Sequence, residues 1–464
     1  MTTSTQALSQ PVTSRLMRGL SATALGPLVT AMIQLGPVPL LLHAWGGAKY
    51  GDWLLLSAVP SYLTLTNLGF GDASGSDMTA RVAAGDREGA LRTFQSSWTL
   101  LLVLSLAVLL VASVLVWWIP WREWMHLSSL SSHRAAGVIL VFASYIVVSQ
   151  QCGILESGYR CDGNFALGTA LGTLLRLLET ALGLGVGLST GNILLAACAY
   201  LATRIAGTFG YGLVLRRKSP WLALGFKWAR LDRIKELAAP AMGFVALPLG
   251  YAVSLQGTNL MIGLVKGPLA VTAFSTLRTM TRLNFQLTTV IAWAVWPELS
   301  AAFGKNNINL ARKLHRNSYQ AGLALSVVAG TFLWLVGPHI YRMWIRNAVP
   351  FDANCFHLLL VVTIANSLWF MSSVVSMSSN VHQRLALAFV MASLASLLLA
   401  AFLTRTFGIA GAAAALLLTD VSMLLMVLRN SMNRLQDTFL QFAIAMFKPP
   451  TIWFSLRNRG EARP

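Results

Sequence analysis

The sequence predicts an all-α integral membrane protein: about twelve transmembrane helices in two six-helix lobes related by an internal parallel repeat. Apolar stretches of about twenty residues recur along the chain, and a helix of that length crosses roughly 30 Å of hydrocarbon. Only 11% of the 464 residues are charged, whereas soluble proteins carry roughly 25%. The polar stretches between the apolar ones are short, so we expect no soluble domain.

The apolar stretches define the expected spans in order. Arg15 and Arg18 precede the first of them, but its length and its prolines favour an uncleaved span over a signal peptide. The expected spans are 19–43, 51–72, 94–119, 135–157, 164–187, 192–215, 238–263, 269–296, 314–339, 354–377, 382–404 and 407–428.

Basic residues set the expected orientation. An even number of spans places both termini on one side, and Lys and Arg gather in the loops and the tail on that side. The positive-inside rule therefore predicts cytoplasmic termini. The net charge of +19 is then explained by an anionic phospholipid membrane as partner, with no role for nucleic acid. The expected parts are a cytoplasmic segment (1–18), a first lobe (19–215), a basic cytoplasmic linker with an interfacial helix (216–237), a second lobe (238–428) and a basic cytoplasmic tail (429–464).

The chain shows no motif for catalysis or for a cofactor. The four cysteines lack metal-ligand spacing, and no Walker motif or nucleotide cradle is present. We therefore expect no metal, no cofactor and no enzymatic activity. Transport would depend on an ion gradient, the membrane potential or removal of the product.

Glycine turns at matching positions suggest the internal repeat. Gly47 opens the second span and Gly267 opens the eighth, 220 residues later. Gly85 precedes the third span and Gly304 precedes the ninth, 219 residues later. Six spans in each half make the repeat parallel, and lobes that move against each other around a central site are a transporter architecture.

Several runs together resemble the signature of a known family. They are GGAKYGDWLLLSA at 46–58, NLGFGDA at 67–73, then Arg81-Val-Ala, Gly85-Asp, and WPELS at 296–300. In order and spacing they are similar to the polysaccharide flippases, in the superfamily that also holds MATE exporters and lipid II flippases. Pro268 and Ala270-Val depart from the first-half pattern, which leaves the substrate open.

The resemblance implies a flippase of the bacterial cytoplasmic (inner) membrane. Such a protein moves an undecaprenyl-diphosphate-linked oligosaccharide repeat unit from the cytoplasmic to the outer leaflet by alternating access. The product serves lipopolysaccharide or exopolysaccharide biosynthesis, so a polymerase and export proteins are the implied partners.

Four arginines are expected near the middle of the bilayer: Arg176, Arg204, Arg278 and Arg282. A charge at that depth costs at least a few kcal/mol, so it faces water or a partner. Arg278 and Arg282 are four residues apart and share a helix face. Because guanidinium groups suit phosphate oxygens, we expect a cationic central cavity in which these arginines bind the diphosphate or acidic sugars.

A structural role is the alternative for two of these arginines. Arg176 could pair with Glu179, and Arg204 could pair with Asp420 or extend to the membrane surface. Glu179 and Asp420 are the only deep carboxylates, so they are the candidates for proton or sodium coupling. Amides inside the spans could line the lumen or join helices: Asn67, Gln256, Asn259, Asn284 and Gln286.

Asp72 with Arg81 is a candidate gate at the cytoplasmic mouth. A MATE-type multidrug exporter is the main alternative function, but it would prefer an acidic cavity. A membrane polysaccharide polymerase is less favoured, because it would need a large external loop. A scaffold would not need arginines inside the membrane.

Overall fold

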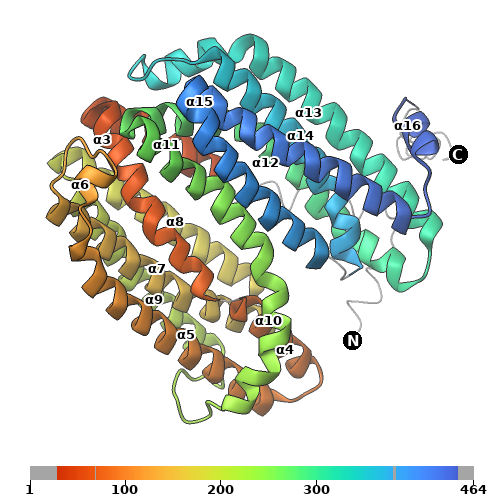
Figure 1. Ribbon diagram of the computed structural model, residues 1–464. Coiled ribbons are helices and arrows are strands. Elements are labelled where there is room, and N and C mark those ends of the chain that lie inside the picture. The colour runs from red at the N-terminus through yellow and green to blue at the C-terminus, as the bar shows by residue number, and fades with distance from the viewer. Residues whose placement is uncertain (1–28, 68, 380–382, 448–464) are drawn as a thin grey trace, which may run out of the picture.

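The computed structural model describes residues 29–67, 69–379 and 383–447, and the regular structure in these ranges is helical, without strands. Long helices lie side by side in an elongated bundle (Figure 1). Seven helices in the described ranges are long and apolar enough to cross a membrane. The predicted all-α membrane class is therefore confirmed. The segment 1–18, residues 19–28 of the first expected span and the tail beyond 447 lie outside the described residues.

The first half contains the first six expected spans. Helical residues 29–35 lead into α3 (Pro37–Ser61), which is kinked at Gly46. Gly46 has φ 75°, a conformation that glycine tolerates best, so the chain turns there between two expected spans. The remaining elements of this half are η1 (Tyr62–Asn67), α4 (Phe70–Ala83), α5 (Arg87–Leu115), η2 (Val116–Trp118), α6 (Trp121–Trp124), α7 (Ser132–Cys161), α8 (Phe165–Thr190) and α9 (Ile193–Lys218).

The second half repeats this order. Its seventh expected span is divided into α10 (Leu231–Ala252), the π-helical segment η3 (Val253–Gly257) and α11 (Thr258–Lys266). Gly408, with φ 62°, divides the long α15 into the last two expected spans. The other elements are α12 (Pro268–Gly304), α13 (Ile308–Ile345), α14 (Ala353–Ser378), α15 (Gln383–Arg434) and α16 (Phe439–Phe447).

The backbone gives the register of the internal repeat. Gly46 (φ 75°, ψ 165°) and Gly267 (φ 80°, ψ 177°) adopt the same conformation 221 positions apart. At the same offset, Asp86 caps α5 and Asn307 caps α13, each through its side-chain oxygen. The offsets of 220 and 219 that the sequence suggested are therefore corrected. The offset of 219 was wrong because the residue with positive φ before α13 is Asn306 and not Gly304.

The linker between the halves differs from the expected interfacial helix. Residues 219–230 form an irregular loop, and α10 begins at Leu231. The side chain of Gln95 on α5 binds this loop twice, at the Ala223 carbonyl and the Trp228 amide, each at 2.8 Å. These bonds satisfy backbone groups that a helix would otherwise pair, and Gly225 further disfavours a helix.

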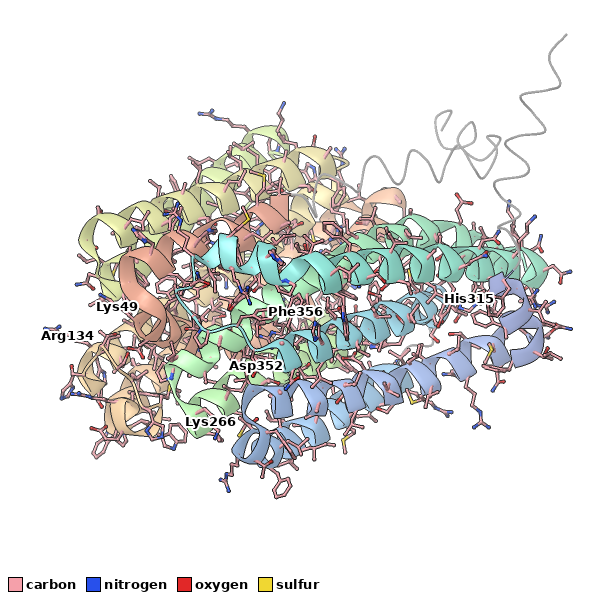
Figure 2. All side chains as sticks on the ribbon, turned by 90° about the horizontal axis from the view of Figure 1, so that it is seen from above. Lys49, Arg134, Lys266, His315, Asp352 and Phe356 are labelled. Atoms are coloured by element: carbon pink, nitrogen blue, oxygen red, sulfur yellow. The ribbon has the colours of Figure 1, made fainter. Side chains whose placement is uncertain are left out.

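The turns between several spans meet at one end of the bundle. Lys49 Nζ donates to the Gly191 carbonyl at 2.5 Å, and Lys266 Nζ donates to the Arg405 carbonyl at 3.3 Å. Figure 2 shows Lys49 and Lys266 at this end and His315 at the opposite end. In the predicted topology these turns lie on one side of the membrane. That this side is external stays a prediction.

The two halves are closed against each other at this same end. Thr272 Oγ1 donates to the Gly47 carbonyl at 2.7 Å, and the backbone of Gly51 lies directly against Pro268. A buried apolar cluster here includes Leu55 of the first half and Val271 of the second. Small residues at the contact allow the backbones to approach closely, as in other membrane helix pairs.

Substitution of Gly51 tests this junction. A Cβ at Gly51 would lie 2.1 Å from the Pro268 carbonyl oxygen, so the halves would have to separate. We expect Gly51→Val to lower the melting temperature in detergent by several degrees, which corresponds to about 1–3 kcal/mol. Gly153→Val is the matched control, because a Cβ there meets nothing within 4 Å. Equal melting temperatures for the two variants would contradict the close contact.

Candidate functional site

A cavity of about 50 Å³, partly open to its surroundings, lies among helices of the second half. Its walls come from α10, η3, α12, α14 and α15. The residues that line it all belong to the second half, so Arg278 and Arg282 lie in this lobe, and a cavity between the lobes stays a prediction. The lining residues are Tyr251, Ser254, Leu255, Arg278, Arg282, Phe285, Leu359, Val362, Thr363, Asn366, Phe389, Leu416 and Asp420.

Arg278 is held in place by its neighbours. Its guanidinium donates to the Leu255 carbonyl and to Asn259 Oδ1, both at 3.1 Å, and lies over the Phe274 ring. Leu255 belongs to the π-helical turn η3, where the backbone hydrogen-bonding pattern shifts and carbonyl groups become available to side chains. Asn259 therefore acts as a positioning residue for Arg278.

Arg282 lies one turn further along α12 and lines the same cavity. It makes no hydrogen bond or ion pair with any residue that the structure describes. Asp420 is close enough to act on it electrostatically, but no ion pair joins them. Asp420 is instead bound by Asn366 Nδ2 and Trp369 Nε1, each at 2.7 Å.

The cavity is cationic. Two guanidinium groups and one carboxylate line it, and among the described residues Arg282 has no hydrogen-bond acceptor. A guanidinium in a largely apolar site binds an anionic group strongly, above all a carboxylate or phosphate that accepts two parallel hydrogen bonds. The arrangement is suited to an anionic ligand.

Arg204 lies elsewhere, in the first half, and is paired. Its Nε is 2.6 Å from Glu179, and its Nη2 donates to the Tyr145 hydroxyl at 2.8 Å. Only 9% of Arg204 and 2% of Glu179 are exposed. The expected partner Asp420 is corrected to Glu179, because α8 and α9 are neighbours in one half whereas Asp420 belongs to the other. Arg204 does not line the cavity.

Arg176 makes no ion pair with Glu179, because Arg204 occupies that carboxylate. It lies on an exposed face of α8, between the exposed side chains of Leu174 and Leu177, and donates only to Thr173 at 3.4 Å. Residues three apart on a helix are near enough to pair, but Glu179 is bound by Arg204 and by the Tyr145 hydroxyl instead. The expectation that Arg176 binds ligand in the cavity is therefore corrected.

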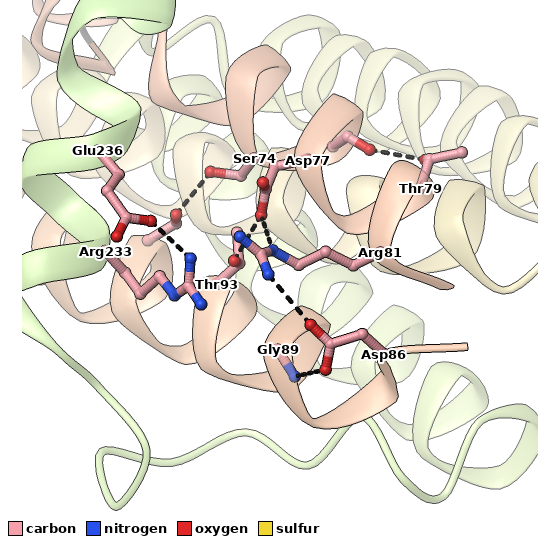
Figure 3. A network of polar contacts seen from close by, with 11 residues as sticks. Ser74, Asp77, Thr79, Arg81, Asp86, Gly89, Thr93, Arg233 and Glu236 are labelled. Carbon is pink, nitrogen blue, oxygen red and sulfur yellow. Dashed lines mark hydrogen bonds and ion pairs between the residues drawn. The ribbon is translucent and has the colours of Figure 1, made fainter. Parts of the chain in front are cut away.

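The structure gives Arg81 other partners than Asp72. Its guanidinium binds Asp77 at 2.7 Å and Asp86 at 3.0 Å (Figure 3). The Gly89 amide and then Arg81 hold the pKa of Asp86 below its ordinary value. Asp72 is nine residues before Arg81, hence on the opposite face of α4, and is exposed. A gate contact involving Arg81 stays a prediction for another conformation.

Comparisons with known proteins bear on the fold. No protein-family model and no curated protein matches the chain. An inward-facing MATE multidrug resistance transporter of the MOP superfamily matches with TM-score 0.75 and 14% identity, over 88% of this chain and 94% of that chain. An outward-facing one matches with TM-score 0.67 and 14% identity, over 96% and 98%.

This chain has the fold of the MATE transporters. A MOP superfamily transporter from Pyrococcus furiosus also matches, with TM-score 0.56 and 14% identity, over 94% of this chain and 96% of that chain. It is described as having a binding pocket of reverse polarity that suggests a different function. The fold therefore agrees with the superfamily that the sequence motifs resemble. None of these three structures is described as a polysaccharide flippase.

Some residues of the site were missed by the sequence analysis. Asn366 and Trp369 position Asp420, and an amide inside the tenth span was a signal for the first of them. Of the amides singled out, Asn259 supports the site, whereas Asn284 joins α12 to α13 through the Ser326 carbonyl. Gln286 donates to Gln34 across the two halves at 2.6 Å.

The pair Arg204–Glu179 predicts a clear difference between two variants. Glu179→Gln leaves the buried Arg204 charge uncompensated, so we expect a loss of roughly 3–5 kcal/mol in the free energy of unfolding. Arg176→Gln, on the exposed face of the same helix, should stay within about 0.5 kcal/mol of the parent. Unfolding in mixed micelles measures both. Equal stability of the two variants would contradict a buried pair, and Glu179→Leu with Arg204→Met should restore most of the loss.

Proposed function

We propose that this chain is a membrane transporter that works by alternating access and binds an anionic group between Arg278 and Arg282. One observation carries the proposal: Arg282 lines a cavity beside a second arginine and one acid, and its guanidinium binds no residue that the structure describes. A charge held there without a partner is costly unless water or a ligand satisfies it.

The fold supports transport. Both inward-facing and outward-facing MATE structures resemble the chain, and the similarity is higher for the inward-facing one. The junction at Gly47 and Thr272 closes one end of the bundle. If that end is external, as the distribution of basic residues predicts, the described state is closed toward the outside.

The finer proposal is a flippase for an undecaprenyl-diphosphate-linked oligosaccharide in the bacterial inner membrane. The motifs at 46–58, 67–73 and 296–300 and the chemistry of guanidinium toward phosphate support it. The diphosphate would bind Arg278 and Arg282, and the glycan would extend out of the second half toward the space between the halves. A polymerase and export proteins would then use the product.

A MATE-type multidrug exporter is the second candidate, and the names of the structural neighbours favour it over the flippase. Asp420 in the same cavity is an acid that a cationic drug could contact. The excess of arginine favours an anion. Asp420 is also the remaining candidate for ion coupling, since Glu179 is engaged by Arg204.

Transport in proteoliposomes separates these functions. The full chain should translocate a lipid-linked oligosaccharide diphosphate, measured as glycan that becomes accessible to an added lectin, and should not extrude ethidium. Each arginine that binds the anion contributes about 1.5–3 kcal/mol, so Arg278→Ala with Arg282→Ala should slow transport by more than about a hundredfold.

The control for transport is Arg176→Ala, which should keep the parent rate because Arg176 lies outside the cavity. Ethidium efflux that survives the double arginine variant and is lost in Asp420→Asn would overturn the anion proposal and support the exporter.

A further inference from the structure

Two opposite charges face the same cavity without pairing. Arg282 on α12 and Asp420 on α15 both line it and influence each other electrostatically, yet no ion pair joins them. Opposite charges attract strongly in apolar surroundings. Because Arg282 and Asp420 do not pair, a polar group is needed to satisfy both of them.

Asp420 is fixed on one side and free on the other. Its Oδ1 accepts both hydrogen bonds, from Asn366 Nδ2 and Trp369 Nε1 at 2.7 Å. Its Oδ2 accepts none from the residues that the structure describes. The two donors engage one carboxylate oxygen and leave the other oxygen for another group.

The rest of the lining offers no second cation to Asp420. Arg278 is engaged with Leu255 and Asn259. The remaining polar side chains of the cavity include the hydroxyl groups of Tyr251 and Ser254, which are neutral. The cavity therefore has an anion-binding pole at Arg282 and a donor-binding pole at Asp420.

We propose that the ligand carries a hydrogen-bond donor, an ammonium or a hydroxyl group, next to its anionic group. The anion binds Arg282, and the donor binds the free oxygen of Asp420. This inference rests on the proposed function, because it adds a second contact to the same site. A phosphate ester with a neighbouring amine or hydroxyl has the required chemistry.

Three small phosphate esters with the same two-carbon chain test this: 2-aminoethyl phosphate, 2-hydroxyethyl phosphate and ethyl phosphate. Their binding to the full-length protein in detergent is measured by thermal shift over a concentration series. We expect the amine to bind about tenfold more tightly than ethyl phosphate, with the hydroxyl between them. Asp420→Asn should reduce the tenfold preference for the amine to less than about threefold.

The controls separate this inference from the proposed function. Arg282→Gln should weaken all three esters about equally, and Arg176→Ala should weaken none. Equal binding of the three esters to the parent protein, or an unchanged preference in Asp420→Asn, would contradict the donor-binding pole at Asp420. Neither result would contradict the anion site at Arg282. No binding of any ester would overturn both. If Asp420→Asn does not fold, the comparison of esters on the parent protein decides alone.

Discussion

The cost of a charge in hydrocarbon is the constraint on which the interior of this protein depends. Every deep arginine must find a partner, water or the surface. Arg204 is satisfied by Glu179 in the first half, and that site is closed to other ligands. Arg278 and Arg282 face a cavity in the second half, where Asp420 is held aside by Asn366 and Trp369. The two halves repeat one topology but differ in their charges: the first contains the Arg204–Glu179 pair, and in the second Arg282 pairs with no described residue.

Glycine makes the closed end of the bundle possible. Gly46 and Gly267 turn the chain in the same way in each half, and Gly51 lets α3 approach the start of α12. The same helices α3 and α12 continue away from this contact, so a change in their packing would move both halves. The cavity of the second half lies along α12, ten to fourteen residues from that junction. A ligand bound at Arg278 and Arg282 therefore acts on the helix that also closes the end.

Hydropathy predicted the all-α membrane class, which seven described helices bear out, and a spacing of four predicted that Arg278 and Arg282 share a face. Both follow from local geometry, which a sequence contains. The partner of Arg204 was not predictable, because Glu179 is on a neighbouring helix and the choice depends on helix packing. Arg176, three residues from Glu179, shows that proximity in sequence does not decide pairing. The register of the repeat was missed because Asn306 replaces a glycine at a positive-φ position.

Direct observation of a bound anion tests the central claim most strongly. A crystal structure of the full chain soaked with tungstate, a tetrahedral anion visible by anomalous scattering, should show a peak between the guanidinium groups of Arg278 and Arg282. The same soak of the variant with both arginines changed to alanine should show no peak there. An anion found at Arg204 instead, or a cavity that stays free of anions at saturating concentration, would contradict the account.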